Sequence, residues 1–465
     1  MIDLSAYRGR RVAVLGLGRS GLSAACALRA GGAELLAWDD KPAGREAAAA
    51  AGLPLADLAS ADWASIAMLV LSPGIPHSHP QPHPVALRAR AAGCEILCDV
   101  ELLWRARRQA RFVGITGTNG KSTTTALTAH ILATAGRAAA AGGNIGRAAL
   151  SLEPLDGDGT YVLELSSYQL ELLPETVFDI AALLNVSPDH LDRHGGLHPY
   201  VAAKRRIFAG QEGDQVAVIG IDDPHSAHVR AALAAAGRQR VLPVSATRPA
   251  PGGVSAAGGR LIDDLEGGAE EVLDLTGIAT LPGAHNWQNA AAAYAVARAA
   301  GLAPEEIAAG LRLYPGLPHR QELVATVGGV RYVNDSKATN ADSAARALAS
   351  YDGNVYWIAG GLPKEGGIAP LAPLFPRVRH AFLIGAAAAD FARTLDGRAA
   401  WTRCGDLATA LALAHEMAQA ERRPGAVVLL SPACASFDQW PNFEARGDAF
   451  RSMAQALAAN AERAA

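Results

Sequence analysis

The chain is poor in cysteine and carries little net charge. Its five cysteines are odd in number and scattered along 465 residues. This pattern excludes a disulfide framework and favours reduced thiols in the cytoplasm. The formal net charge is −3, without a basic excess. Composition therefore gives no reason to expect nucleic acid as a partner or a polybasic patch for a membrane.

Long apolar runs are also missing. No stretch of about 18 apolar residues without charges occurs, so we expect no spanning helix. The segment Met1–Ser5 lacks the charged and apolar regions of a signal peptide. Hydrophobic residues, mostly Ala, Leu and Val, nevertheless make up 50% of the chain. They are sufficient for several cores, and the length predicts roughly three domains.

Strand-like and helix-like segments alternate through nearly the whole chain. This alternation predicts an α/β protein with mostly parallel sheets. Three strands run into a glycine-rich loop, at Arg11–Gly21, Phe112–Gly120 and Val355–Lys364, and each is expected to mark one domain. The boundaries are placed near residue 98 and in a Pro/Gly linker near residue 316. The predicted domains are 1–98, 99–316 and 317–465.

The segment Thr116–Thr123 is the most specific motif. It follows an apolar strand, precedes a helix and contains a Gly-x-x-Gly-Lys-Ser loop. In this arrangement the backbone N–H groups of the turn and the helix N-terminus face the phosphates of a nucleotide. Lys121 adds a positive charge, and the Ser122 hydroxyl can ligate Mg²⁺. The strict phosphate-loop pattern has glycine at Ile115, so the motif predicts ATP binding by a tighter loop.

A second glycine-rich turn, Gly16–Gly21, follows the first strand. Its Gly-x-Gly-x-x-Gly spacing, with Asp39 and Asp40 about 20 residues later, fits the dinucleotide fingerprint. The same turn can simply let a helix pack against a strand, or can bind another nucleotide such as a UDP-sugar. The motif does not separate NAD from UDP.

A Pro/Gly loop, Ser72–Ile75, follows another strand of this region. By its position it belongs at the carboxyl end of the sheet, where α/β proteins bind ligands. His77, His79 and His83 come next and raise the alternative of a metal site. The prolines between them favour a stiff, exposed loop instead.

Two polar features interrupt the apolar strands of the central region. Glu164 lies in an otherwise apolar strand, where burial is expensive unless the carboxylate is paired or ligates a cation. An exposed strand end is the alternative. Another strand ends in the loop Asp189–His194, a second place to hold magnesium. Lys204 is one of three basic residues best explained as a solvated helix face, and nothing in the local pattern singles it out.

Three asparagines are further candidates. Asn185 ends a strand, while Asn286 and Asn289 lie at the start of a long Ala-rich helix beside His285. Helix N-termini favour asparagine, so capping explains one of them. Two asparagines with a histidine exceed what capping needs.

Taken in order along the chain, these segments resemble the Mur ligase family. The resemblance covers the whole chain and is carried by Thr116–Thr123, Gly142–Gly146, Glu164–Ser167, Asn185–Val186, Asp189–Asp192, His285–Asn289, Gly316–Arg320 and Asn334–Asn340. The last segment, with Ser431–Gln439 and Asn442–Gly447, resembles the branch that adds glutamate to UDP-N-acetylmuramoyl-L-alanine. The resemblance implies an α/β fold with a Rossmann-like N-terminal domain, a central phosphate-loop ATPase-type domain and a Rossmann-like C-terminal domain.

The resemblance also implies roles for the matched positions. Lys121 would neutralise the γ-phosphate, Ser122 and Glu164 would hold one magnesium ion, and His190 would hold a second. Lys204 matches a position where the family carries a carbamylated lysine, whose anion can ligate magnesium. The implied ATP contacts are Gly117, Thr118, Asn119, Gly120, Lys121, Ser122, Thr123, Asn289, Arg320 and Asp335. The implied nucleotide-sugar contacts are Gly18, Arg19, Ser20, Asp39, Asp40, Lys41, Ser72, Gly74 and Asn144. The implied glutamate contacts are Lys337, Thr339, Lys364, Ser436 and Phe443.

The implied reaction is amide ligation in peptidoglycan synthesis. A substrate carboxylate attacks the γ-phosphate of ATP, and the amine of glutamate then displaces phosphate from the acyl phosphate. The expected cofactors are ATP and Mg²⁺, and the expected partners are UDP-N-acetylmuramoyl-L-alanine and glutamate, bound by a cytoplasmic monomer. A hypothesis of a different class, an NAD-dependent oxidoreductase built on Gly16–Gly21, leaves Thr116–Thr123 unexplained.

One loop departs from the family pattern. Pro363 precedes Lys364, and Glu365 places an extra carboxylate beside a site that must hold glutamate. Like charges disfavour such a ligand unless they are paired. Loop drift with D-glutamate retained is one explanation. A variant that adds L-glutamate, followed by epimerisation by a separate enzyme, is the alternative.

Overall fold

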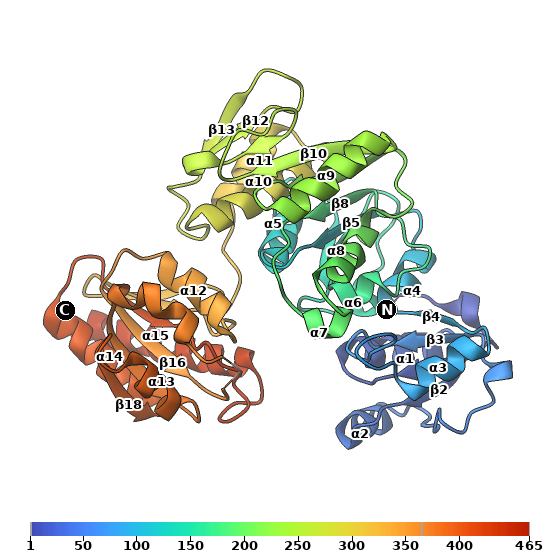
Figure 1. Ribbon diagram of the computed structural model, residues 1–465, viewed down its shortest axis with the longest axis horizontal. Coiled ribbons are helices and arrows are strands. Elements are labelled where there is room, and N and C mark those ends of the chain that lie inside the picture. The colour runs from blue at the N-terminus through green and yellow to red at the C-terminus, as the bar shows by residue number, and fades with distance from the viewer. Residues whose placement is uncertain (1, 364–365, 465) are drawn as a thin grey trace. The chain divides into compact units, whose positions relative to one another are not determined.

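The computed structural model describes residues 2–363 and 366–464, so Lys364 and Glu365 of the divergent loop lie outside the described residues. The chain forms two compact units, Met1–Tyr314 and Pro315–Ala465. They contain three mainly parallel sheets with helices between the strands, which confirms the α/β prediction (Figure 1). The proposed boundaries near 98 and 316 stay predictions. Within the described ranges, no helix has the length and apolar character needed to cross a membrane.

The first sheet has four parallel strands in the order β2-β1-β3-β4. Its strands are β1 (Arg11–Leu15), β2 (Glu34–Trp38), β3 (Met68–Leu71) and β4 (Glu95–Leu97), and the helices of this region are α1 (Arg19–Ala30), α2 (Pro42–Ala50), α3 (Pro84–Ala91) and α4 (Asp99–Ala106). All of β3 is buried, as expected for a parallel strand covered on both faces. Because the strands are parallel, the loops after β1, β2 and β3 lie at one edge of the sheet.

The second sheet has nine strands in the order β13-β12-β11-β10-β9-β8-β5-β7-β6. The strands are β5 (Arg111–Thr116), β6 (Ala139–Gly143), β7 (Thr160–Glu164), β8 (Ile180–Leu183), β9 (Gly213–Gly220), β10 (Gln239–Ser245), β11 (Val254–Ser255), β12 (Arg260–Asp263) and β13 (Glu270–Asp274). Its helices are α5 (Lys121–Thr134), α6 (Ser167–Leu170), α7 (Leu191–His194), α8 (Leu197–Arg205), α9 (Pro224–Ala236), α10 (Ala284–Ala299) and α11 (Pro304–Leu313). Strand β5 lies between β7 and β8, with Ile115 opposite Glu164 and Thr116 opposite Leu183. The carboxyl ends of β7, β5 and β8 therefore lie side by side at one edge of this sheet.

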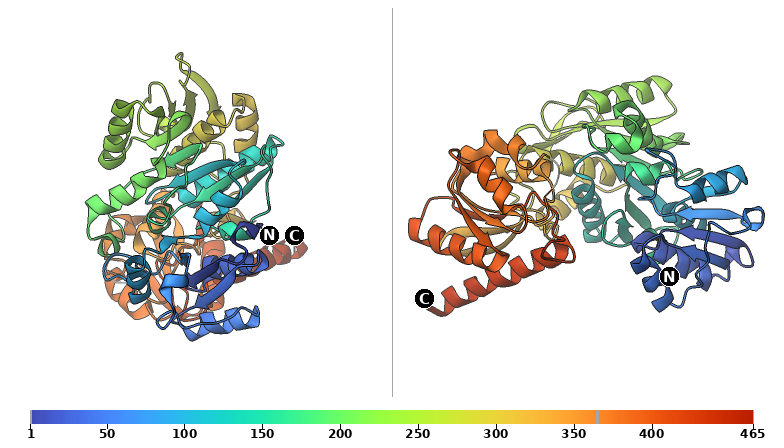
Figure 2. Two further views of the ribbon diagram at one scale, coloured as in Figure 1. Left: turned by 90° about the vertical axis from the view of Figure 1, so that its right-hand side faces the viewer. Right: turned by 60° about the horizontal axis from the view of Figure 1, so that its bottom comes forward.

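The third sheet makes up the second unit and has the order β14-β15-β19-β16-β17-β18. Its elements are β14 (Glu322–Val327), β15 (Val330–Asn334), α12 (Ala341–Ala349), β16 (Val355–Gly360), β17 (Val378–Ile384), α13 (Ala388–Leu395), β18 (Trp401–Gly405), α14 (Leu407–Glu421), β19 (Val427–Leu430) and α15 (Phe443–Ala464). Among the described residues of this sheet, β14 alone pairs antiparallel, in a hairpin with β15. Helix α15 is the long C-terminal helix in Figure 2.

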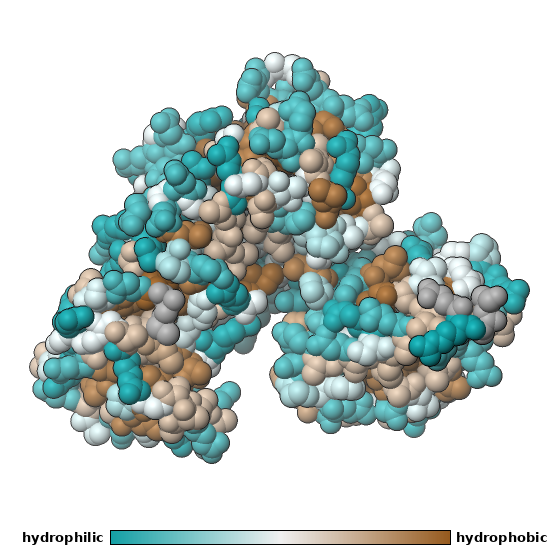
Figure 3. Space-filling view, turned by 180° about the vertical axis from the view of Figure 1, so that it is seen from behind, coloured by the Kyte–Doolittle hydropathy of each residue, from teal (hydrophilic) through white to brown (hydrophobic). Residues whose placement is uncertain are grey.

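Hydrophobic residues fill the interior of each unit. Trp357 in β16 and Tyr161 in β7 are among the largest fully buried side chains. On the face drawn in Figure 3, hydrophilic residues cover much of both units and hydrophobic ones are scattered among them. The apolar half of the sequence therefore serves mainly as core.

Candidate active site

The loop between β5 and α5 is the centre of the candidate site. Gly120, just before α5, has a φ of 84°, a conformation that favours glycine. A Cβ at this position would collide with Asn289 Oδ1 of α10, so Asn289 packs directly against the loop. The Lys121 ammonium donates to the carbonyl oxygens of Gly117 and Thr118, at 2.9 and 2.8 Å. Lys121 therefore folds back over the loop that the motif assigns to phosphate.

Asn185, two residues after the end of β8, holds this loop in shape. Its Oδ1 accepts from the Asn119 backbone N–H at 2.9 Å, and its Nδ2 donates to the Asn119 carbonyl oxygen at 3.2 Å. The Asn185 carbonyl oxygen also accepts from Thr118 N at 2.9 Å. The Thr118 hydroxyl lies 3.1 Å from both Ser187 O and Tyr200 Oη. These bonds fix the loop to the neighbouring strand end.

Glu164 ends β7 and is only 3% exposed, so the alternative of an exposed strand end is wrong. Its Oε1 accepts from Asn144 Nδ2 at 2.8 Å. Its Oε2 is buried and meets no hydrogen-bond donor among the described residues. An orphaned carboxylate oxygen is costly unless a cation reaches it. Asn144, predicted to contact the nucleotide sugar, therefore also orients Glu164.

The structure contradicts the prediction that Lys204 lies on a solvated helix face. Lys204 is only 2% exposed, whereas Arg205 and Arg206 are exposed. Its Nζ donates to the Gly117 carbonyl oxygen at 2.8 Å and lies 4.6 Å from the centre of the Tyr200 ring. The side chain thus reaches the phosphate loop from α8.

The surroundings of Lys204 disfavour its charged form. Burial, followed by the charge of Lys121, lowers the pKa of Lys204 well below its usual value, although Asp189 and Glu164 oppose the shift. The neutral amine is the form that captures CO₂. The geometry therefore fits the carbamylation that the family resemblance implies.

His190 stands at the start of α7 with a φ of 52° and is half-exposed. Its Nε2 lies 3.5 Å from Asp189 Oδ2, and its ring centre lies 5.3 Å from that of Tyr168. Burial lowers the pKa of His190, and the charges of Lys121 and Lys204 lower it further, against Asp189. The charges of Lys121 and Lys204 therefore act on His190 as well.

The donor set fits a magnesium ion held jointly with a nucleotide. Within residues 2–363 and 366–464, no three His, Cys, Asp or Glu side chains gather closely enough to bind a metal. Mg²⁺ usually takes one or two carboxylates together with waters and substrate phosphates. The bare Oε2 of Glu164 and the buried Ser122 suit that pattern. Metal binding by Ser122, Glu164, His190 and Lys204 stays a prediction.

The predicted nucleotide-sugar residues gather at the carboxyl edge of the first sheet, except Asn144, which follows β6 of the second sheet. Asp39 accepts from Leu17 N at 2.6 Å and from Lys41 N at 2.8 Å, and so ties together the turns after β1 and β2. Arg19, at the start of α1, donates to Gly146 O at 2.7 Å. This bond reaches the segment that carries Asn144.

The Ser72–Ile75 loop lies beside the first glycine-rich turn. A Cβ at Gly16, whose φ is 86°, would collide with the Ser72 side chain, so the turn needs glycine for close packing. His83 and Asp40 are paired at 2.9 Å. His77 hydrogen-bonds to Glu171 at 3.1 Å, and its side chain is only 14% exposed, so this part of the loop is less exposed than predicted.

In the second unit, Asp335 directly after β15 is buried. It accepts from Ser431 Oγ at 2.8 Å and from Gln321 N at 3.2 Å. Burial raises the pKa of Asp335 to about 7, although the Ser431 bond and the Arg320 charge oppose this shift. Arg320 Nε is itself buried without an acceptor among the described residues. Arg320 and Asp335 are therefore neighbours, and their contacts to ATP stay predictions.

Several predicted glutamate contacts also come together in the second unit. Lys337 Nζ lies 5.0 Å from the centre of the Phe443 ring, and Thr339 N donates to Lys337 O at 2.8 Å. Ser336 Oγ donates to Phe443 O at 2.8 Å, which joins the segment Asn334–Asn340 to the start of α15.

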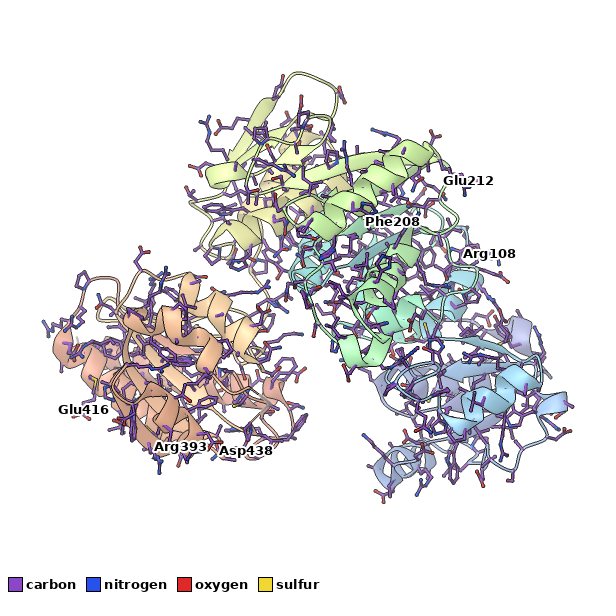
Figure 4. The ribbon with its side chains drawn as sticks, in the orientation of Figure 1. Arg108, Phe208, Glu212, Arg393, Glu416 and Asp438 are labelled. Atoms are coloured by element: carbon purple, nitrogen blue, oxygen red, sulfur yellow. The ribbon has the colours of Figure 1, made fainter. Side chains whose placement is uncertain are left out.

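Ser436 is buried in the neighbouring loop after β19. Leu362 N donates to Ala435 O at 2.9 Å, so the loop that leads toward Lys364 passes beside Ser436. Asp438, labelled in Figure 4, accepts from Ala386 N at 3.0 Å and anchors the same loop to the end of β17.

Comparison with known proteins decides the family. A Mur ligase middle domain matches residues 115–297, and a Mur ligase glutamate ligase domain matches residues 319–434. A protein of Rhodospirillum rubrum named UDP-N-acetylmuramoylalanine–D-glutamate ligase is 53% identical over 464 residues, covering 98% of this chain and 97% of its own. The chain belongs to the Mur ligase family. A protein of Paramagnetospirillum magneticum with the same name is 54% identical over 457 residues, covering 98% of this chain and 99% of its own.

Solved structures show the Mur ligase fold as well. The UDP-N-acetylmuramate–alanine ligase of Thermotoga maritima matches with a TM-score of 0.58 at 16% identity, covering 96% of this chain and 99% of its own. A pseudomurein peptide ligase of Methanothermus fervidus matches with a TM-score of 0.55 at 17% identity, covering 97% and 100%. At such identities the match concerns architecture alone.

The Mur ligase fold accounts for the first glycine-rich turn without NAD. The sheet that carries Gly16–Gly21 has four strands, whereas the dinucleotide-binding fold has six strands in two halves. Family membership and this topology both argue against the oxidoreductase hypothesis.

Sequence reasoning missed two buried residues of this Mur ligase. Tyr200 contacts both Thr118 and Lys204, but a tyrosine on a short helix carries no signal of such a role. Arg446 is 1% exposed and donates to Ser336 Oγ at 3.0 Å and to Cys434 O at 3.2 Å. Burial lowers the pKa of Arg446 to about 10. Its place in the Asn442–Gly447 motif was the only available signal.

Proposed function

We propose that this Mur ligase joins D-glutamate to UDP-N-acetylmuramoyl-L-alanine, with ATP converted to ADP and phosphate. Proteins of that name, 49 to 54% identical over almost their full length, support the assignment. The observation that carries the chemistry is the convergence of Lys121 and Lys204 on the Gly117 carbonyl oxygen, in the loop that follows β5. Glu164, with one bare oxygen, ends the strand beside β5.

In the first step the free carboxylate of the nucleotide-sugar substrate attacks the γ-phosphorus of ATP. The bond between the γ-phosphorus and the β–γ bridging oxygen breaks, ADP leaves, and an acyl phosphate forms. Lys121 neutralises charge on the phosphoryl group, and the backbone N–H groups of residues 117–123 hold the other phosphates. Asn185 contributes by keeping that loop in one conformation.

In the second step the amine of D-glutamate attacks the acyl carbon. The bond from that carbon to the phosphate oxygen breaks, phosphate leaves, and the nitrogen releases a proton to solvent as the amide forms. Lys337, Thr339, Ser436 and Phe443, together with Lys364, are the proposed glutamate contacts. Lys337, Thr339, Ser436 and Phe443 belong to the loops after β15 and β19 and to the start of α15.

Mg²⁺ and a carbamate on Lys204 are proposed components of the site. Ser122, Glu164, His190 and the modified Lys204 would hold the ion, which would spread the negative charge of the transferring phosphoryl group. The lowered pKa of Lys204 and the bare oxygen of Glu164 support this assignment. The domains are proposed to divide the work: residues 1–98 for the nucleotide sugar, 99–316 for ATP and 317–465 for glutamate.

We propose D-glutamate as the substrate, and not L-glutamate, because the high-identity relatives are named as D-glutamate ligases. All five cysteines are free thiols, as suits the proposed cytoplasmic location. A monomer remains our expectation.

The direct test offers D- and L-glutamate separately with UDP-N-acetylmuramoyl-L-alanine, ATP and Mg²⁺, and measures phosphate release and the amide product. We expect release with D-glutamate only. Release with L-glutamate alone would establish the stereochemical alternative. Background release with both amino acids would overturn the ligase assignment.

A further inference from the structure

Arg193 of α7 touches the loop after β3, which belongs to the first sheet. Its Nη2 donates to Ile75 O at 3.4 Å, and its guanidinium carbon lies 4.9 Å from the centre of the Tyr168 ring. Arg193 is 7% exposed, and its Nε and Nη1 find no acceptor among the described residues. Burying a guanidinium with so few acceptors is costly, so packing stability alone does not explain its placement.

Glu171, just after α6, makes a second connection between the same two segments. Its Oε1 lies 3.2 Å from His194 Nδ1 of α7, and its Oε2 lies 3.1 Å from His77 Nε2, two residues beyond Ile75. Arg90 Nη2 donates to His77 Nδ1 at 3.3 Å. Because Nδ1 therefore accepts, Nε2 carries the proton that His77 donates to Glu171.

The second ring nitrogen of His194 also has a hydrogen-bond partner. Its Nε2 lies 2.9 Å from Ser167 Oγ, and its side chain is fully buried. Its Nε2 and the Ser167 hydroxyl are therefore hydrogen-bond partners, while its Nδ1 faces Glu171. Ser167 stands at the start of α6, three residues after Glu164. The bridge from His77 thus continues to the strand end that carries Glu164.

Tyr168 joins these contacts to His190. The ring centre of Tyr168 lies 5.3 Å from that of His190 and 5.3 Å from that of His194, and Arg193 covers the same ring. A displacement of the loop after β3 would pull on Arg193 and on His194. Because α7 is a single short turn, it would carry His190 with it.

We propose that Arg193 and Glu171 are positioning residues that couple occupation of the Ser72–Ile75 loop by a nucleotide diphosphate sugar to the placement of His190. The inference rests on the proposed function, which assigns the loop to the nucleotide sugar and His190 to the metal. Two contacts between the same segments give the coupling a physical route. Binding of the sugar nucleotide and binding of the metal then strengthen each other by the same factor.

The test measures Mn²⁺ affinity by electron paramagnetic resonance in the presence of a non-hydrolysable ATP analogue, with and without UDP-N-acetylmuramoyl-L-alanine. In the enzyme without substitutions, the substrate should tighten Mn²⁺ binding about fivefold or more. In R193Q and in E171Q this factor should fall to less than about twofold, since each variant breaks one connection. R193K, which keeps a cationic donor, should recover part of the coupling.

Arg206→Gln is the matched control. Arg206 donates to Leu170 O at 2.8 Å, so its guanidinium also binds a backbone carbonyl oxygen. Among the described residues its hydrogen bonds go to Leu170 and Leu173, and none goes to the loop after β3 or to α7. R206Q should keep the full coupling factor. Thermal melting establishes which variants are folded, and E171D replaces E171Q if the latter unfolds.

The inference would be overturned if the substrate tightened Mn²⁺ binding by the same factor in the folded variants R193Q, E171Q and R206Q as in the enzyme without substitutions. So would an unmodified enzyme in which the substrate leaves Mn²⁺ affinity unchanged. Phosphate release with D-glutamate is measured on the same preparations, so that failure of the ligase assignment is distinguished from failure of the coupling. A purely structural role for Arg193 predicts a lower melting temperature with coupling intact, which also contradicts the proposal.

Discussion

Lys121 and Lys204 donate to the same atom, the carbonyl oxygen of Gly117, at 2.9 and 2.8 Å. Two ammonium groups on one oxygen repel each other, and burial adds to the cost for Lys204. This repulsion disappears when Lys204 loses its proton. When the neutral amine of Lys204 then becomes a carbamate, its negative charge attracts the Lys121 ammonium.

Carbamylation of Lys204 is therefore the first prediction. Protein incubated with ¹³C-bicarbonate should show one carbamate carbon resonance, and K204R should lack it because a guanidinium does not form this adduct. Since the neutral amine is needed, the signal should persist at neutral pH and fade as the pH falls through the lowered pKa. K204R should also lose most ligase activity. An identical resonance in K204R would assign the carbamate elsewhere.

Replacement of Glu164 should separate activity from stability. E164Q keeps the oxygen that accepts from Asn144, but it removes the negative charge of the orphaned Oε2. We expect ligase activity to fall by about 100-fold or more, the size of effect seen when a group that stabilises transition-state charge is lost. The melting temperature without ligands should stay the same or rise, since an unpaired buried charge is removed. Activity within a few-fold of the unmodified enzyme would contradict the metal-ligand role.

Gly120 provides a test of the phosphate loop. In G120A the new methyl group would collide with Asn289 Oδ1, in addition to the strain of a positive φ. ATP binding measured by calorimetry should weaken more than about tenfold, and stability should fall by roughly 2 kcal/mol or more.

Gly136 is the matched control, because its φ of 72° is similar while no atom of another described part of the chain lies within 4 Å of a Cβ there. G136A should cost only about 1 kcal/mol and leave ATP binding unchanged. Equal effects of the two substitutions on ATP binding would show that backbone strain alone, and not the contact with Asn289, governs the loop.

The stability of the second unit should depend on pH through Asp335. Its pKa of about 7 lies above the ordinary 3.8. The stability contributed by the protonated carboxyl is therefore fully present below pH 3.8 and is lost as the pH rises through 7. D335N cannot ionise. Between pH 5 and 8.5 the unmodified protein should lose roughly 3 kcal/mol more than D335N, from about two pH units at 1.36 kcal/mol each.

Urea unfolding at pH 5 and at pH 8.5 measures this difference. The Ser431 hydroxyl that now donates to Asp335 can rotate to accept from the asparagine amide, so the substitution preserves the local bonding. The same loss of stability with pH in both proteins would show that Asp335 is ionised in the folded state near neutral pH.

The sequence determined the elements whose signals are local. Thr116–Thr123 has a strand before it and a helix after it, and those neighbours suffice to place a phosphate loop. Glu164 stood out because a carboxylate in an apolar strand requires a cation or a partner. The alternation of strands and helices likewise determined the α/β class, which the three sheets confirm.

Only the tertiary structure decided which charged side chains are buried. Lys204 and its exposed neighbours Arg205 and Arg206 look alike in the sequence, because burial depends on which side of α8 faces the strand ends of the second sheet. The same holds for Arg193, whose position beside Ile75 joins residues far apart in the chain. Local pattern fixes periodicity and turns, whereas the convergence of Lys121, Lys204 and the Gly117 carbonyl requires the packing of strands and helices in three dimensions.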